Sequence, residues 1–414
     1  MSQIESVIVV GASAAGISCV RTLRQLEFSG SITLVDKDQH GAYERPPLSK
    51  QILMQADSTH HDIALINDNE LTALNIEAHY GDGVRQLDPT TRTIILESGK
   101  ALTADAIVLA TGGEARRLPI EGSNLPQVLV LRHYEDALNL RQRLTADTRV
   151  AVIGGGFIGA ETTASLSKKS SASIQWLDAA ALPMAHLLPT ELCEKIVANH
   201  CAQGVTLTSH CRLDKFIEQA DGSVGILFDD GTSIEVDVIV MGVGMAPSTP
   251  YLSDAISAEL LNPATGGIQV NDNQATKFAG VYAAGDVAAV SQADGSTVRH
   301  EHWQSAQHQG ERAAAAILNQ ELPVAPVDWF WSDQGDLHIE MAGKILPTKE
   351  HLVMRLEGEW PVYFSVVDNR VVGAVSVNNP NAVRAAMRMI KNDVDVEPSQ
   401  LANPELPLRK LMRG

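Results

Sequence analysis

The chain is poor in cysteine, and the few cysteines it has exclude two kinds of site. Its 414 residues include only Cys19, Cys193, Cys201 and Cys211. No two of them form a CxxC pair or show the spacing of metal ligands, so we expect neither a metal centre nor a redox dithiol. Such sparse use of cysteine is typical of the reducing cytoplasm.

Basic residues and long apolar runs are also scarce. Lysine and arginine total 32 against 50 acidic residues, which gives a formal net charge of −18. Binding to a nucleic-acid backbone requires basic surface, so nucleic acid is not an expected partner. No apolar run reaches the roughly 18 residues of a membrane span. The first ten residues, MSQIESVIVV, lack the basic region of a secretory signal, so we expect a cytoplasmic protein without a membrane partner.

The strongest pattern that is present is an internal repeat. Residues 6–36 read SVIVVGASAAGISCVRTLRQLEFSGSITLVD, and residues 149–178 read RVAVIGGGFIGAETTASLSKKSSASIQWLD. In each stretch an apolar run leads through a turn of small residues into an amphipathic segment, a second apolar run and an aspartate. This order predicts the strand–helix–strand unit of dinucleotide-binding folds. In the first copy we expect strands over 7–10 and 32–35, and a helix that ends near Phe28.

Both copies carry the residues that a dinucleotide requires. Glycines in the turn let backbone N–H groups approach a pyrophosphate at the positive end of the helix, and the acid accepts hydrogen bonds from a ribose hydroxyl. The pattern residues are Gly11, Ser13, Gly16 and Asp36 in the first copy and Gly154, Gly156, Gly159 and Asp178 in the second. The first copy therefore has a serine in place of the middle glycine. A single such motif can serve packing alone, but two copies favour binding.

Three further apolar runs end in small residues, as strands at a ligand site do. They are ADAIVLATGG (104–113), VDVIVMGVG (236–244) and GVYAAGDVA (280–288). Ligands of parallel sheets lie outside the carboxyl ends of the strands, so we expect Thr111, Gly112, Gly242, Gly244 and Asp286 beside cofactors. Two nucleotide sites in one chain suggest a flavin that stays bound and a nicotinamide that exchanges.

With these features the chain resembles the FAD-dependent ferredoxin reductases, the NADH-dependent components of bacterial oxygenase systems in the pyridine nucleotide-disulfide oxidoreductase class. Motifs of that family follow one another along nearly the whole chain, among them YERPPLSK (43–50), GGGFIGAE (154–161), HEHWQSAQHQG (300–310) and WFWSDQGD (329–336). The resemblance implies that NADH passes hydride to FAD, which then passes electrons singly to an iron–sulfur protein such as a [2Fe-2S] ferredoxin.

The resemblance also implies roles for single residues. The proline-rich loop lies along the flavin in this family, which places Lys50 near the reactive ring with Glu161 as its partner. Trp331 matches an aromatic residue beside the flavin and the nicotinamide. From the residues alone, Lys50 would be a solvated lysine and Trp331 a core residue. Further cofactor contacts are expected from Ala14, Ala15, Lys37, Arg45, Val84, Ala110, Arg116, Arg132, Phe157, Ile158, Val243 and Trp303.

Two departures from the family bear on the ribose contacts. The family commonly has an acid at the position of Lys37, so the FAD ribose contact could fall to Asp36 or Asp38. Two arginines that usually follow the position of Asp178 are absent, because Leu182 and His186 replace them. Fewer positive charges disfavour a 2′-phosphate, so we expect NADH to be preferred over NADPH.

The expected fold is α/β, with two interleaved Rossmann-like dinucleotide-binding domains and a small α+β C-terminal domain. The FAD domain would cover 1–113 and 248–322, the NAD domain 114–247, and the C-terminal domain 323–414. On a predicted amphipathic helix near the end, Arg384, Arg388 and Lys391 recur on one face. This face is either solvated or a basic contact for an acidic ferredoxin.

Two other functions are open to such a sequence. A disulfide or peroxide reductase of the same class needs a reactive cysteine early in the chain. Residues 43–50 contain none, and Cys19 falls within the first predicted helix, where a buried structural thiol is expected. A flavoprotein related to apoptosis-inducing factor would act through interactions and oxidise NADH slowly, and turnover would distinguish it from a reductase.

Overall fold

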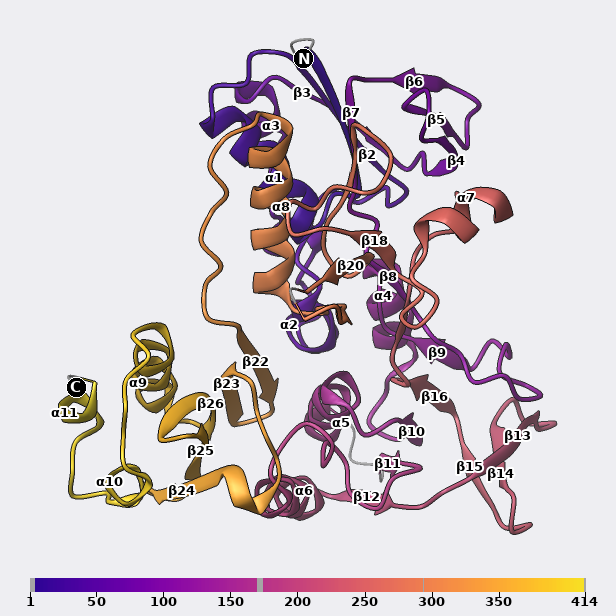
Figure 1. Ribbon diagram of the computed structural model, residues 1–414. Helices are drawn as coiled ribbons and strands as arrows, with labels where there is room; N and C mark the ends of the chain where they lie inside the picture. The colour runs from indigo at the N-terminus through magenta and orange to yellow at the C-terminus, as the bar shows by residue number, and fades with distance from the viewer. Residues whose placement is uncertain (1–3, 170–173, 293, 413–414) are drawn as a thin grey trace. The chain divides into compact units, whose positions relative to one another are not determined.

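The computed structural model describes residues 4–169, 174–292 and 294–412 (Figure 1). The chain divides into two compact units, each made from three separate segments. The first unit consists of Met1–Pro47, Asp57–Glu114 and Met245–Ala325, and the second of Leu48–Ala56, Ala115–Gly244 and Pro326–Gly414. Three short elements lie where the chain passes from one unit to the other: η1 (Pro46–Ser49), β8 (Gly113–Ala115) and β17 (Met245–Pro247).

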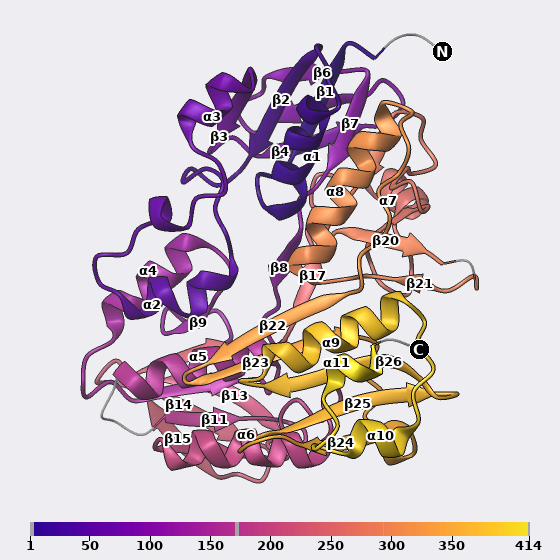
Figure 2. The same ribbon diagram turned by 90° about the vertical axis from the view of Figure 1, so that its left-hand side faces the viewer.

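A five-stranded parallel sheet in the order β19-β7-β1-β2-β3 forms the centre of the first unit. Its middle strand, β1, is buried from Val7 to Val10, as expected for a strand covered on both faces. Helices α1 and α8 run side by side against this sheet (Figure 2). They approach closely because Gly310 has no side chain: a Cβ there would lie 2.1 Å from the carbonyl oxygen of Ala15.

The elements of the first unit have these bounds: β1 (Ser6–Val10), α1 (Ala14–Gln25), β2 (Ser31–Asp36), η2 (His60–Ile63), α3 (Asp68–Ala73), β3 (Ile76–Tyr80), β4 (Val84–Asp88), β5 (Thr93–Leu96), β6 (Ala101–Thr103), β7 (Ala106–Leu109), α7 (Asp254–Leu260), β18 (Ile268–Val270), β19 (Val281–Ala283), β20 (Ala288–Ser291), β21 (Thr297–Val298) and α8 (Trp303–Ile317). Strands β4–β6 form an antiparallel sheet, and β18, β20 and β21 form another three-stranded sheet.

The second unit repeats this architecture and adds a second sheet. Its parallel sheet has the order β12-β11-β10-β16-β9; read from the other end, the strands β16-β10-β11-β12 correspond to β7-β1-β2-β3, and β13–β15 repeat the antiparallel addition of β4–β6. The added sheet, β22-β23-β26-β25-β24, is antiparallel. One of its faces contributes Leu337 and Ile339 to a core shared with Leu192 and Ile196 of α6. Helix α9 packs against β26 and β23.

The elements of the second unit have these bounds: α2 (Gln51–Met54), β9 (Val128–Val130), α4 (Tyr134–Arg143), β10 (Val150–Ile153), α5 (Phe157–Lys169), β11 (Ile174–Leu177), α6 (Thr190–Ala202), β12 (Val205–Thr208), β13 (Leu213–Glu218), β14 (Val224–Phe228), β15 (Ser233–Val236), β16 (Val238–Met241), β22 (Trp329–Gln334), β23 (Leu337–Gly343), η3 (Lys349–His351), β24 (Leu352–Leu356), β25 (Pro361–Val367), β26 (Arg370–Val377), α9 (Pro380–Lys391), α10 (Pro398–Ala402) and α11 (Leu408–Leu411).

The predicted fold class is confirmed: the protein has two parallel-sheet dinucleotide-binding folds and a C-terminal α+β part. One local expectation is wrong: helix α1 ends at Gln25 instead of near Phe28, because Glu27 adopts a left-handed φ of 61°. The proline-rich loop contains the 3₁₀ turn η1, since a first helical turn needs no N–H donors from its prolines. No helix in the described ranges is long and apolar enough to cross a membrane.

Candidate functional site

The turn between β1 and α1 lies at the carboxyl edge of the first sheet. Gly11 has a φ of 111°, and a Cβ on it would lie 2.1 Å from the carbonyl oxygen of Ala110. A Cβ on Gly16 would lie 1.8 Å from the carbonyl oxygen of Gly11. These two glycines therefore allow the helix to pack against the strands. Ser13 is the N-cap residue of α1, and its side chain makes no capping hydrogen bond.

Asp36 is the acidic side chain that lies on this turn. Its Oδ2 accepts a hydrogen bond from the N–H of Ala12 at 2.5 Å, and its Oδ1 accepts one from the N–H of Asp38 at 2.8 Å. Lys37 forms an ion pair with Glu114 instead. Among the three candidates for the ribose contact, Asp36 at the end of β2 is the one that accepts a hydrogen bond from the glycine turn.

Asp286 comes to the same edge from a distant part of the chain. It follows Gly285, which has a φ of 78° and whose N–H donates to Gln309 Oε1 at 2.8 Å. A Cβ on Gly285 would lie 3.1 Å from the Cβ of Ala15, so the backbone beside Asp286 lies against α1. Thr111 donates its hydroxyl to the carbonyl of Ser248 at 2.7 Å. The other predicted residues of the first unit are Ala14, Lys37, Arg45, Val84, Ala110, Gly112 and Trp303.

The glycine turn of the second unit has the same geometry with one open position. Cβ atoms on Gly154 and Gly159 would lie 2.3 Å from the carbonyl oxygen of Gly242 and 2.1 Å from that of Gly154. A Cβ on Gly156 would meet no atom of the described chain within 4 Å. Gly156 precedes α5, so open space lies at the helix N-terminus, where a pyrophosphate binds. This turn fits a dinucleotide.

The acid of the second turn occupies the position equivalent to that of Asp36. The backbone of Gly155 lies so close to Asp178 that a Cβ would come within 1.8 Å of its Oδ2. Arg116 donates its backbone N–H to the carbonyl of Gly244 at 2.9 Å. The other predicted residues of the second unit are Arg132, Phe157, Ile158, Gly242 and Val243, together with Lys50, Glu161 and Trp331.

Lys50 and Glu161 form an ion pair in the second unit. Nζ of Lys50 lies 3.0 Å from Oε1 of Glu161 and 3.5 Å from Oδ2 of Asp333. The side chain of Glu161 is 4% exposed and that of Asp333 is 40% exposed, so the ammonium joins a buried and a half-exposed carboxylate. The family resemblance implied the first partner, and nothing in the sequence indicated the second.

Two serines complete the surroundings of Glu161. Ser49 donates its hydroxyl to Oε2 at 2.7 Å, and Ser332 donates to Oε1 at 2.8 Å. The carbonyl of Ser49 in turn accepts the hydroxyl of Ser165 at 2.7 Å. Burial raises the pKa of Glu161, while Lys50 and the serine hydroxyls act in the opposite direction. Ser49 lies in the motif YERPPLSK and Ser332 in WFWSDQGD, and nothing in the sequence connects these two motifs.

Trp331 lies on the face of the C-terminal sheet that also carries Asp333. Its ring stacks on that of Trp329, with centroids 5.0 Å apart. On the neighbouring strand, His338 Nδ1 lies 2.6 Å from Asp333 Oδ1, and Glu340 Oε1 lies 3.2 Å from Trp329 Nε1. Alternation along β22 turns Trp331 and Asp333 to one face and Ser332 to the other. Residues on both faces of β22 thus contact the ion pair: Asp333 contacts Lys50, and Ser332 contacts Glu161.

Thiol chemistry has no support at either turn. Burial raises the pKa of Cys19 in α1 to about 12, whereas a reactive thiol has a lowered pKa. Burial also raises the pKa of Cys193 to about 12. Within the described ranges, no group of three or more histidine, cysteine, aspartate or glutamate side chains could hold a metal ion.

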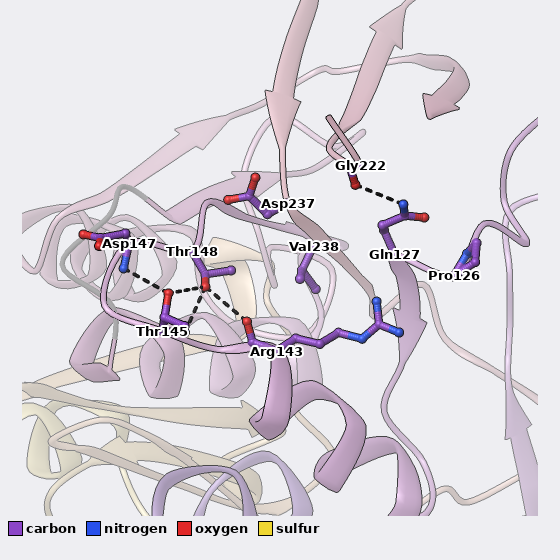
Figure 3. A pocket seen from close by; sticks show the side chains of 9 residues that line it. All are labelled: Pro126, Gln127, Arg143, Thr145, Asp147, Thr148, Gly222, Asp237 and Val238. Carbon is purple, nitrogen blue, oxygen red and sulfur yellow. Dashed lines mark hydrogen bonds between the residues drawn. The ribbon is translucent and has the colours of Figure 1, made fainter. Parts of the chain in front are cut away.

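A hollow of about 440 Å³ opens at the opposite edge of the second parallel sheet (Figure 3). Its lining includes Thr148, which precedes β10, Val238 at the start of β16, and Arg143. Gln127 also lines it and donates to the carbonyl of Gly222 at 3.0 Å. Dinucleotides bind at carboxyl ends of strands, so this hollow at the amino ends is not the nucleotide site.

Two family patterns cover most of the chain. Residues 5–310 match the family described as pyridine nucleotide-disulphide oxidoreductase. Residues 329–412 match the reductase C-terminal family.

Three known proteins are similar over nearly the full length. The "3-phenylpropionate/cinnamic acid dioxygenase ferredoxin--NAD(+) reductase component" of Photorhabdus laumondii subsp. laumondii is 29% identical, over 95% of this chain and 98% of the relative. The "p-cumate 2,3-dioxygenase system, ferredoxin--NAD(+) reductase component" of Pseudomonas putida is 29% identical over 98% of each. The solved covalent complex of putidaredoxin reductase with putidaredoxin gives a TM-score of 0.90 at 28% identity, covering 99% and 98% of the two chains.

Burial of Glu161 predicts that its effect on stability depends on pH. Because the folded state raises its pKa, it binds a proton more tightly than the unfolded chain does. The stability of the wild type relative to Glu161→Gln should therefore be greatest below about pH 4, and should fall by up to about 1.4 kcal/mol per pH unit as the pH rises towards the folded pKa. Urea unfolding of both proteins across this range measures the difference.

The matched control is Asp105→Asn. Hydrogen bonds from Glu5 and Ser6 lower the pKa of Asp105, so its contribution to stability is lost as the pH falls. The stability difference between the wild type and Glu161→Gln and that between the wild type and Asp105→Asn should therefore change with pH in opposite directions. A change in the same direction would contradict the environment described for Glu161.

Proposed function

Since the chain belongs to the pyridine nucleotide-disulphide oxidoreductase family and, within it, to the FAD-dependent ferredoxin reductases, we propose that it passes electrons from NADH through FAD to a small iron–sulfur protein. The observation that carries this proposal is the occurrence of two dinucleotide turns together with the Lys50–Glu161 ion pair, which contacts Asp333 and Ser332 of the WSDQ strand. The two dioxygenase-system relatives support the same activity, and the putidaredoxin complex supports a ferredoxin-type acceptor.

The two turns divide the cofactors between them. FAD would bind the turn of the first unit, with its pyrophosphate at the N-terminus of α1 and its ribose at Asp36. NADH would bind the turn of the second unit, with its pyrophosphate beside Gly156 and its ribose at Asp178. The domain limits expected from the sequence and the contacts of the other predicted residues, such as Arg132 and Trp303, remain predictions.

The residues around Lys50 supply electrostatics to this reaction. A flavin held at the first turn would supply the hydride acceptance from NADH and the release of single electrons. Lys50 would provide positive charge where negative charge develops, and the hydrogen-bonded carboxylate of Glu161 fixes the position of that ammonium. Trp331 would present an aromatic surface beside the cofactors. None of the three needs to exchange a proton with substrate.

The alternatives receive less support. A disulfide or peroxide reductase would need a reactive thiol, and burial raises the pKa of Cys19 to about 12. A flavoprotein acting through interactions would not need the resemblance to dioxygenase reductase components. The free cysteines, three of them buried, accord with the proposed cytoplasmic location.

Steady-state kinetics test the proposed function. The purified protein should be yellow, should oxidise NADH with many turnovers per second, and should reduce cytochrome c only when a [2Fe-2S] ferredoxin is added. A colourless protein that does not take up FAD would contradict the proposal. A long-lived complex with NADH and negligible turnover would favour the interaction protein.

The geometry of the second turn predicts that two glycine substitutions have different effects. Gly156→Ala places a methyl group in the open space, so the free energy of unfolding should change by less than about 1 kcal/mol. The same methyl group occupies the expected pyrophosphate position and should weaken NADH binding roughly tenfold, or about 1.4 kcal/mol. Calorimetric titration with NADH and urea unfolding measure the two effects.

Gly159→Ala provides the matched comparison. Its Cβ would lie 2.1 Å from the carbonyl oxygen of Gly154, so this change should destabilise the fold strongly. If the Gly156→Ala protein binds NADH as tightly as the wild type does, this result would contradict the proposal that NADH binds at this turn.

The basic face of α9 predicts a contact with the acceptor. Arg384, Arg388 and Lys391 are exposed on this helix. Reversing all three to glutamate should raise the KM for an acidic ferredoxin roughly tenfold at low salt and leave NADH-dependent ferricyanide reduction unchanged. The control is reversal of exposed Arg85 and Lys100 in the first unit, which should leave both activities unchanged. An unchanged KM in the α9 variant would mean that this face is only solvated.

A further inference from the structure

A chain of buried polar side chains leads from α6 to Glu161 within the second unit. His200, at the end of α6, is 2% exposed, and its Nε2 lies 3.0 Å from Gln334 Oε1. Gln334 donates from Nε2 to Ser332 Oγ at 3.3 Å. Ser332 then donates its hydroxyl to Glu161 Oε1 at 2.8 Å. Two side chains of β22 thus connect a histidine of α6 to a carboxylate of α5.

The surroundings of Gln334 fix the direction of these hydrogen bonds. Its Nε2 also lies 3.5 Å from the Sδ of Met184, which can accept a hydrogen bond but has no proton to donate. The amide nitrogen therefore faces Met184 and Ser332, and the amide oxygen faces His200. His200 must be the donor in that contact. Burial lowers the pKa of His200, so its neutral ring carries one N–H, and that proton lies on Nε2.

We propose that His200 is a positioning residue for Glu161: its Nε2–H tautomer orients Gln334 and thereby directs the Ser332 hydroxyl proton to the carboxylate. With the proton on Nδ1, the amide would have to turn its nitrogen towards His200. Its oxygen would then take the hydroxyl proton of Ser332, and Glu161 would lose one of its donors. The importance of His200 for turnover rests on the proposed function, whereas its effect on Glu161 does not.

The His200 end of this series of hydrogen bonds is held by residues that are bonded to the glycine turn of the second unit. The ring of His200 lies against that of Trp176, with centroids 5.0 Å apart. Trp176 donates its Nε1–H to the carbonyl of Gly154 at 3.0 Å, and Met184 donates its backbone N–H to the carbonyl of Gly155 at 2.8 Å. The residues that set the ring of His200 and the amide of Gln334 are therefore bonded to the turn where NADH is proposed to bind.

The decisive experiment is a double-mutant cycle on the full-length FAD-loaded protein. The variants are His200→Leu, His200→Gln, Ser332→Ala and His200→Leu with Ser332→Ala. In each one, the pKa of Glu161 is obtained from the pH dependence of unfolding relative to the matching Glu161→Gln protein. His200→Leu should raise this pKa by about one pH unit, as expected for the loss of one hydrogen bond to a carboxylate. Ser332→Ala should do the same.

The double variant should show no larger shift than Ser332→Ala alone, since both changes remove the same donor. His200→Gln retains a side-chain N–H and should restore most of the wild-type value. Additive shifts, or no shift with His200→Leu, would overturn the proposal.

A measurement on the unchanged protein completes the test. The ¹⁵N chemical shifts of His200, assigned with the His200→Gln variant, should show the proton on Nε2. A proton on Nδ1 would overturn the proposal even if His200→Leu did not fold. Failure of the wild type to oxidise NADH would instead contradict the proposed function, and would leave the tautomer and the pKa of Glu161 as valid tests of His200.

Discussion

The organisation of the second unit depends on the hydrogen bonds and the ion pair that surround the buried carboxylate of Glu161. A carboxylate charge removed from water is destabilising by several kcal/mol unless donors surround it. Its donors are Lys50 Nζ, Ser49 Oγ and Ser332 Oγ, which come from two segments far from α5 in the sequence. These bonds are among the contacts that hold residues 48–56 in the second unit, although the chain on either side of them belongs to the first.

A second constraint, shared by both units, is the closeness of backbone to backbone at the glycine turns. Gly11 lies against the carbonyl of Ala110, and Gly154 lies against that of Gly242. In each case the partner is the residue directly after the neighbouring parallel strand. The turn and that strand end therefore define one another, which places the acid, the helix N-terminus and the neighbouring strand end at the same edge. The two units reach the same geometry despite different residues at Ser13 and Gly156.

The sequence predicted what depends on local spacing. The repeat identified both parallel sheets, both turns and their acids, because strand periodicity and glycine positions express these features directly. The network around Glu161 could not be found in this way. Ser332 and Gln334 alternate along β22 with residues of the opposite sheet face, so the sequence does not mark them as a pair. His200 is the one histidine of α6, and its sequence position does not indicate its hydrogen-bond partner. Their relation arises only from packing of segments far apart in sequence. Likewise, the left-handed Glu27 that ends α1 has no glycine to mark it.

The network is better explained by the site than by stability. Well-packed apolar side chains of similar volume often stabilise a fold as well as a buried ion pair does, or better. Folding alone therefore gives no reason for placing Glu161, Ser332 and Gln334 inside the second unit. Their hydrogen bonds instead run in one direction towards a carboxylate that holds Lys50, and such fixed dipoles need no rearrangement when charge develops nearby. Lys50 also contacts the half-exposed Asp333, and its own side chain is 20% exposed. The buried carboxylate of Glu161 therefore fixes the position of the ammonium group, while that group stays accessible.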